Sequence, residues 1–123
     1  MVRKEGSGLK ALVLTSICFA LPVFADVKLT RSGDRIDIAI DGKPFSTFHM
    51  GTEGNKPYLW PLITADGKAI TRRWPMEDIK TDSHDHKHQR GLWFSHGDVN
   101  GTDFWGNDPS YNTPNRGKIV LDK

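Results

Sequence analysis

Four of the chain's five histidines lie within residues 83–96, together with Arg90 and Asp85, and two more carboxylates, Asp82 and Asp98, flank the segment. His84, His86 and His88 are spaced two apart, so in an extended strand their imidazoles would project from one face. Neutral imidazole is the commonest ligand of first-row metals, and a divalent metal held by His86, His88 and His96 is therefore one interpretation. The third ligand of such a site would be one of His96, Asp82 and Asp85.

The same residues also suit acid–base chemistry without a metal. A histidine beside a carboxylate titrates near neutral pH, so His86 or His88 is the expected proton donor. Arg90 would hold an anionic or hydroxyl-rich substrate through its planar guanidinium, which gives a catalytic set of His86, His88 and Arg90. Trp93 or Trp105 would supply a flat apolar face for a sugar ring. The substrate-binding candidates are Asp98, Asn100, Asp103 and Trp105.

A third interpretation gives this segment a purely structural role. An Asn-Gly pair readily takes positive φ, so Asn100 and the glycine after it are expected to form a turn. Trp93 and Phe94 are neighbours on an expected strand, so one of them faces the core and the other faces away. His84, which polar residues flank, and the isolated His49 are expected to be structural histidines.

The elements that must position these residues are those of an all-β protein. Residues 34–41 alternate, with three isoleucines on one face, which is typical of a half-buried strand. Frequent turn signals, among them Asp-Gly pairs at 41–42 and 66–67, favour a sandwich or a barrel, and of the two we expect an antiparallel β-sandwich. One helical turn at most is expected, in residues 74–80. The other expected strands are 27–30, 44–49, the proline-containing 56–63, 68–72, the apolar core strand 92–96 and the start of a strand at 117–123.

Residues 1–25 have the three parts of a secretory signal peptide. Basic residues come first, a short apolar run follows, and Pro22 and small residues precede position 26. The apolar run is roughly a dozen residues long, too short to cross a bilayer of about 30 Å. We therefore expect cleavage after Ala25, export to the periplasm or the extracellular space, and one small domain over residues 26–123 without a membrane span.

Charge and cysteine content narrow the function classes further. The chain has 17 basic and 15 acidic residues, and the leader holds three of the former and one of the latter, which leaves 14 of each in residues 26–123. This balance gives no electrostatic basis for binding nucleic acid. The single cysteine, Cys18, lies in the leader, so residues 26–123 can form neither a disulfide nor a thiolate metal site.

The motifs around these residues resemble a bacterial family of unknown function, DUF6807, which carries the label "methane oxygenase PmoA-like". The resemblance covers most of residues 43–105 and is most specific in DHKHQRGLWF and HGDVNGTDFW. Lys87 stands where the family usually has proline, and Gln89 where it usually has the second of two adjacent histidines. The positions that match the family's motif are Asp85, His86, His88, Arg90, His96, Asp98, Asn100, Asp103 and Trp105.

The resemblance implies both a fold and a choice of functions. The family is similar in its strand-rich layout to β-sandwich proteins of the galactose-mutarotase type, which handle sugars, and its members are longer, so this chain would be an N-terminal part of such a domain. The leading hypothesis is an exported protein that binds or modifies a small molecule, a saccharide; the cofactor is left open between none and a divalent first-row metal. The alternatives are a metal-binding oxidoreductase, as the family label implies, and a non-catalytic carbohydrate-binding module.

Overall fold

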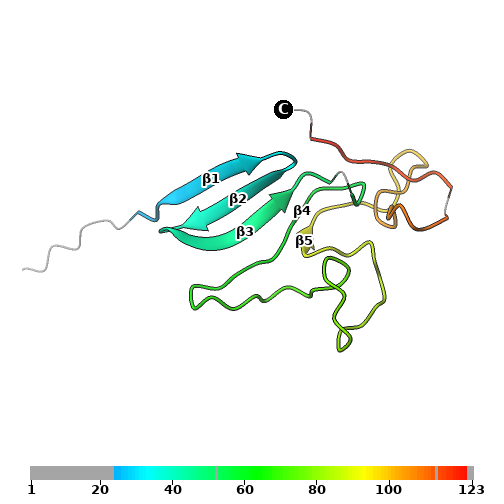
Figure 1. Ribbon diagram of the computed structural model, residues 1–123. Helices are drawn as coiled ribbons and strands as arrows, with labels where there is room; N and C mark the ends of the chain where they lie inside the picture. Colours follow the sequence, from blue (N-terminus) through cyan, green and yellow to red (C-terminus); the bar gives the residue numbers. More distant parts are fainter. Residues whose placement is uncertain (1–23, 52, 113, 122–123) are drawn as a thin grey trace, which may run out of the picture.

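The computed structural model describes residues 24–51, 53–112 and 114–121, and nearly all of the expected signal peptide therefore lies outside the described residues. Five strands form one antiparallel sheet in the order β1-β2-β3-β4-β5 (Figure 1). Their bounds are β1 Val27–Ser32, β2 Arg35–Ile40, β3 Lys43–His49, β4 Tyr58–Leu59 and β5 Leu92–Trp93. The described part of the chain contains no helix, which confirms the all-β prediction.

Two tight turns make the first three strands a continuous meander. Asp41 and Gly42 both have positive φ, 50° and 74°, as a two-residue hairpin turn requires. The Asp41 amide donates to the Asp26 carbonyl at 2.8 Å, and the Asp26 amide donates to the Asp41 carboxylate at 2.8 Å. The sequence predicted these three strands to within two residues, because alternation and turn chemistry are local properties of the chain.

The register divides the sheet into an apolar and a polar face. Ile36 lies opposite Phe48, which in turn lies opposite Leu59, and this row is apolar. On the other face, one row crosses four strands and joins Arg35, His49, Tyr58 and Trp93. Side chains of neighbouring strands in one row are in contact distance, so the register itself gathers polar groups along this line.

The chain outside these strands is mostly irregular. Residues between β4 and β5 run as long loops (Figure 1), in which only Ile63 and Ala69 form a bridge, across the predicted turn at 66–67. Segment 92–96 was predicted to be a core strand, but only Leu92–Trp93 is a strand, and it lies at the edge of the sheet. Phe94 is 87% exposed, because the chain leaves the sheet after Trp93.

The C-terminal segment differs from prediction in the same way. The start of a strand was predicted at 117–123, of which 122–123 lie outside the described residues. Residues 117–121 form no strand, and their backbone makes isolated bonds to loops instead of a ladder. The Ile119 amide donates to the Asn55 carbonyl at 2.7 Å, and the Gly117 amide donates to the Asp103 carbonyl at 2.7 Å. The second sheet of a sandwich and the likeness to mutarotases stay predictions.

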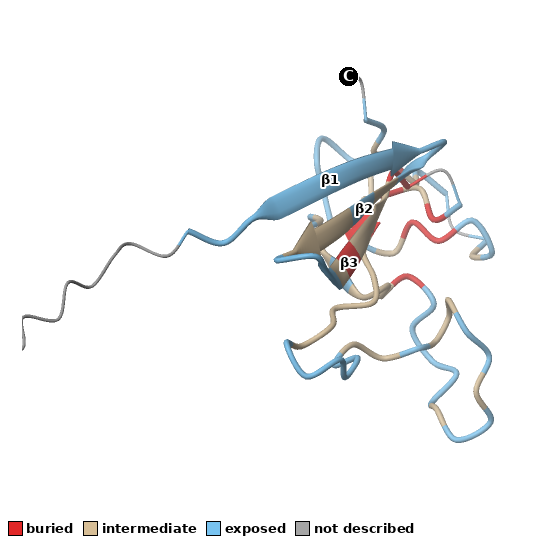
Figure 2. Ribbon diagram, turned by 60° about the vertical axis from the view of Figure 1, so that its left-hand side comes forward, coloured by how far each residue is buried: buried red, intermediate tan, exposed pale blue. Residues whose placement is uncertain are grey.

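The interior of the described chain is more polar than apolar. The buried apolar side chains are Met50 and Tyr58, whereas Ser46, Lys56, His88, Asn107 and Asp108 are buried polar ones. Figure 2 shows the buried segments gathered where the end of β3 meets the neighbouring loops, while β1 is exposed along its length. No helix in the described part is long and apolar enough to cross a membrane.

Candidate functional site

The polar row of the sheet forms the floor of the candidate site. His49 and Tyr58 lie opposite each other on β3 and β4, and their rings stack in parallel with centroids 4.5 Å apart. The His49 ring is also fixed by a 3.2 Å contact between its Nε2 and the Trp60 carbonyl oxygen. Arg35 extends the row on one side and Trp93 on the other.

Arg90, two residues before β5, reaches this floor and is held by a buried carboxylate. Its Nη2 donates to Asp108 Oδ2 at 3.2 Å, and the two side chains are only 14% and 4% exposed. The guanidinium carbon lies 5.8 Å from the Tyr58 ring centroid, and the backbone of Gly54 approaches it so closely that a Cβ there would meet Nε at 3.0 Å. Burial raises the pKa of the Asp108 carboxyl, but hydrogen bonds from Ser110 and Arg90 outweigh it and leave that pKa below its ordinary value.

A cavity of about 330 Å³, which we call the inner cavity, opens beside Arg90 and three members of the row. This volume is within the usual size range of small-molecule sites, about 300–1,000 Å³. Its lining combines cations, carboxylates and aromatic rings, and consists of Asp34, Arg35, His49, Glu53, Tyr58, Trp60, Pro75, Met76 and Arg90.

Behind the row lies a fully buried lysine. Lys56 Nζ donates to the Trp105 carbonyl oxygen at 2.6 Å and lies 4.2 Å from the Trp93 ring centroid. Burial lowers the pKa of this ammonium from 10.5 to about 8, although the nearby carboxylates of Asp103 and Asp108 act in the opposite direction. Lys56 therefore joins the loop around Trp105 to the sheet.

His88 is buried beside Lys56 in a cluster of aromatic rings. Its Nδ1 lies 3.3 Å from the Tyr111 hydroxyl, while its buried Nε2 has no hydrogen-bond partner among the described residues. Trp93, Trp105 and Tyr111 surround the ring at centroid distances of 5.8–6.4 Å. Burial, and then the charge of Lys56, lower the His88 pKa, so the ring is neutral at pH 7 and suits a proton acceptor better than a donor.

His86 and His84 differ from His88, because both are exposed. His86 has a φ of 43°, which turns it away from the strand geometry that was expected, and its Nδ1 lies 2.9 Å from Asp85 Oδ2. Hydrogen bonding to His86 is the main reason why the pKa of the Asp85 carboxyl is lowered. His84 stacks on Trp74 with centroids 4.3 Å apart and lies 3.2 Å from Asp78, a structural arrangement.

The predicted substrate-binding residues divide into two groups. Asp98 and Asn100 form an exposed turn, in which Asp98 Oδ1 accepts the Gly101 amide at 2.7 Å and Asn100 has a φ of 54°. Asp103 Oδ1 accepts the Trp105 amide at 2.8 Å, so it shapes the loop that carries Trp105. The Trp105 ring packs edge-on against Trp93 at 4.7 Å. Only this second group lies next to Lys56 and His88.

The metal interpretation depends on His86, His88 and His96 lying together. The first two rings are 5.7 Å apart between centroids, but His96 is exposed and its Nδ1 accepts the Asp98 amide at 3.3 Å. Within the described ranges, no group of three or more histidine, cysteine or carboxylate side chains could hold a metal ion.

Sequence reasoning gave no functional role to the row residues Arg35, His49 and Tyr58. It also missed three residues that hold the surrounding loops in place: Lys56, Asp108 and Tyr111. Lys56 begins the proline-containing segment 56–63, and Asp108 and Tyr111 follow the HGDVNGTDFW motif, so all three lie outside the two most specific motifs. All three contact their partners across 18 or more positions of sequence, so no local signal marks them.

A family model matches residues 35–123, and its description is "Family of unknown function (DUF6807)". The chain belongs to this family. No curated protein and no solved structure matches it. The DUF6807 match begins at β2 and includes Lys56, His88, Arg90 and Asp108, whereas β1 precedes it. The resemblance stated from the motifs is thereby confirmed at the level of the family.

Proposed function

We propose that this DUF6807 protein binds a saccharide in the inner cavity. The observation that carries the proposal is the cross-strand row, which places the Arg35 guanidinium, the His49 imidazole and the Tyr58 phenol side by side along one wall. Arg90 supplies a second guanidinium, fixed by Asp108.

The chemistry of this lining suits a hydroxyl-rich ring. Each sugar hydroxyl can donate and accept a hydrogen bond, and the cavity offers both partners, with donors on Arg35 and Arg90 and acceptors on Asp34 and Glu53. Sugar rings also have apolar C–H faces, which Trp60 and the stacked His49–Tyr58 pair could cover. A purely apolar ligand would leave these charged groups unpaired, at a cost in affinity.

The proposal is one of binding rather than turnover. His86 and His88, the expected proton-transfer groups, are not among the residues that line the inner cavity, although Arg90 is. His88 is neutral at pH 7 because burial lowers its pKa, and His86 points its Nδ1 at Asp85. Of the alternatives raised by the sequence, a carbohydrate-binding module therefore requires the fewest side chains beyond those that line the inner cavity.

The test is direct titration of the full chain with a panel of neutral and acidic saccharides, followed by calorimetry. Arg35→Gln and Glu53→Gln change exposed residues of the cavity, so these variants should keep the fold and bind about tenfold less tightly, as expected for loss of a hydrogen bond to a charged group. Arg73→Gln is the matched control, since Arg73 is exposed and lies outside the cavity lining. Equal affinities for Arg35→Gln and Arg73→Gln would contradict the assignment of the site.

A further inference from the structure

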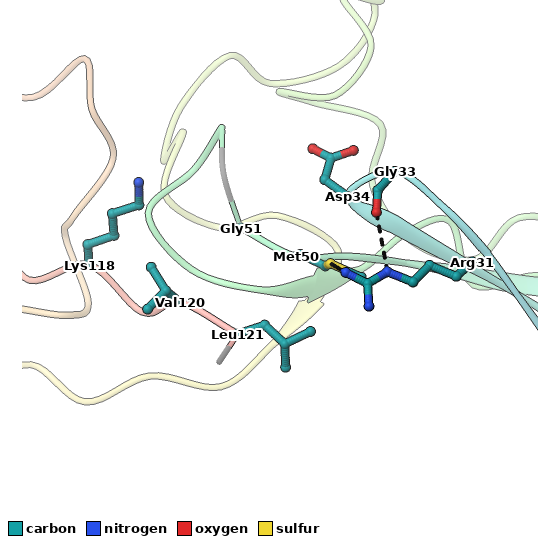
Figure 3. A pocket seen from close by; sticks show the side chains of 8 residues that line it. All are labelled: Arg31, Gly33, Asp34, Met50, Gly51, Lys118, Val120 and Leu121. Atoms are coloured by element: carbon teal, nitrogen blue, oxygen red, sulfur yellow. Dashed lines mark hydrogen bonds between the residues drawn. The ribbon is translucent and has the colours of Figure 1, made fainter. Parts of the chain in front are cut away.

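A second cavity, which we call the outer cavity, lies between the turn after β1 and the C-terminal segment. It has a volume of about 240 Å³. Figure 3 shows Arg31, Asp34 and Met50 on one side of it and Lys118, Val120 and Leu121 on the other. It lies outside the set of residues that sequence analysis singled out, and its two walls come from opposite ends of the described chain.

A small third cavity, which we call the neck, shares lining residues with both the outer cavity and the inner one. The neck has a volume of about 10 Å³, room for about one water molecule. Asp34, Met50 and Gly51 line both the neck and the outer cavity, while His49 and Tyr58 line both the neck and the inner cavity. The three spaces therefore adjoin one another, and we call them together the trough.

The outer cavity has a surplus of positive charge. Among the described residues, Arg31 makes two long contacts, 3.5 Å from Nε to the Gly33 carbonyl oxygen and 4.0 Å from Nη2 to the Met50 sulfur. Most of its N–H donors are therefore available to a ligand. Lys118 forms no ion pair with any described residue, and the one carboxylate of the lining is Asp34.

The same cavity also offers apolar contact. Val120 and Leu121 are 65% and 43% exposed, and Met50 faces them across the cavity. A ring that has apolar faces and carries a carboxylate matches both features, because the carboxylate would meet Arg31 and Lys118. A neutral ring would use the apolar contacts alone.

We infer that the trough takes an oligosaccharide, with one ring in each cavity, the glycosidic linkage at the neck, and a uronic acid residue in the outer cavity. This inference rests on the proposed binding of a saccharide in the inner cavity. It adds a second subsite, so that a ligand of two rings fills both cavities, and a preference for negative charge at one end. Arg31 and Lys118 are the residues that would set this preference.

The experiment is calorimetric titration of the full chain with glucose, galactose, glucuronic acid, galacturonic acid, and neutral and uronic acid-containing disaccharides built from them. An Arg31→Gln/Lys118→Gln double variant removes both cations, and Lys28→Gln/Lys43→Gln is the matched control outside the trough. We expect uronic acid-containing disaccharides to bind the unmodified chain at least about tenfold more tightly than monosaccharides. The double variant should bind uronic acid-containing disaccharides no more tightly than neutral ones and keep its affinity for monosaccharides, and the control should change neither.

Different results would overturn the second subsite and the saccharide site in the inner cavity. Equal affinities for mono- and disaccharides, or a double variant that weakens both to the same degree, would overturn the second subsite while leaving the inner cavity as the binding site. Tight binding of neutral and acidic disaccharides alike would overturn the role given to Arg31 and Lys118. An absence of binding to every member of the panel would overturn the saccharide proposal itself.

Discussion

The buried ammonium of Lys56 should make the stability of this protein rise with pH on the alkaline side of neutrality. Burial lowers the Lys56 pKa from 10.5 to about 8, so between these values the unfolded chain binds a proton that the folded chain does not. Stability must then increase with pH across that window. At about 1.4 kcal/mol per pKa unit, the free energy of unfolding should gain up to about 3 kcal/mol between pH 8 and pH 10.5.

Lys56→Met isolates this contribution. Methionine has a similar shape and no charge, so the variant should lose the hydrogen bond to the Trp105 carbonyl and also the pH dependence. Urea unfolding, followed by tryptophan fluorescence at pH 7, 8, 9 and 10, gives the free energy of unfolding of the unmodified chain and of the variant at each pH. The stability of the unmodified chain relative to the variant should climb by about 1–3 kcal/mol over this series.

The control is Lys43→Met, since Lys43 is exposed at the start of β3. Tyr58, whose pKa is raised mainly by burial, lowers stability at the most alkaline values, but it is present in all three proteins and cancels in the comparison. A constant difference between the unmodified chain and Lys56→Met, or the same slope for Lys43→Met, would refute the reasoning.

Three further results are expected, each measured by urea unfolding. Asp108→Asn should cost about 3–5 kcal/mol because Arg90 would keep a buried, uncompensated charge, and a loss below 1 kcal/mol would contradict the buried pair. Gly91→Ala should lower the free energy of unfolding more than Gly67→Ala does. Both glycines have positive φ, but only at Gly91 would the Cβ collide with the backbone of β4. Equal losses of stability in the two variants would contradict that packing. His88→Phe should flatten the fall in stability below pH 6.5, because the lowered His88 pKa makes the unfolded chain the better proton acceptor there, and an unchanged acid limb would argue against it.

The part of the fold that sequence alone predicted is the part that depends on neighbouring residues. Strands β1 to β3 follow from the alternation of isoleucines and from the turn at Asp41 and Gly42, and both signals act over a few positions. Strand β5 was predicted too long, because an apolar run such as 92–96 does not reveal where the chain leaves the sheet.

The candidate site was predicted in part. The density of ionisable groups around residues 84–90 drew attention to Arg90 and His88, which lie close to Lys56 and Asp108. It did not separate the buried His88 from the exposed His86, because that difference arises from packing against Trp105 and Tyr111. The row across the sheet needed the register of four strands, which no single segment encodes.

Because most of the buried side chains in the described part are polar, this protein should tolerate amino-acid substitutions in its interior less well than a protein with a hydrophobic core. Hydrophobic interiors accept many substitutions of similar volume, because dispersion forces have no preferred direction. Here Asn107 is fully buried, and its side-chain amide donates hydrogen bonds to the carbonyl oxygens of Asn55 and Gly117. The hydrogen bonds of the buried Lys56 and Asp108 depend on angle and distance in the same way. Substitutions that preserve the size of the side chain but not its hydrogen bonds should therefore destabilise the protein most at these positions.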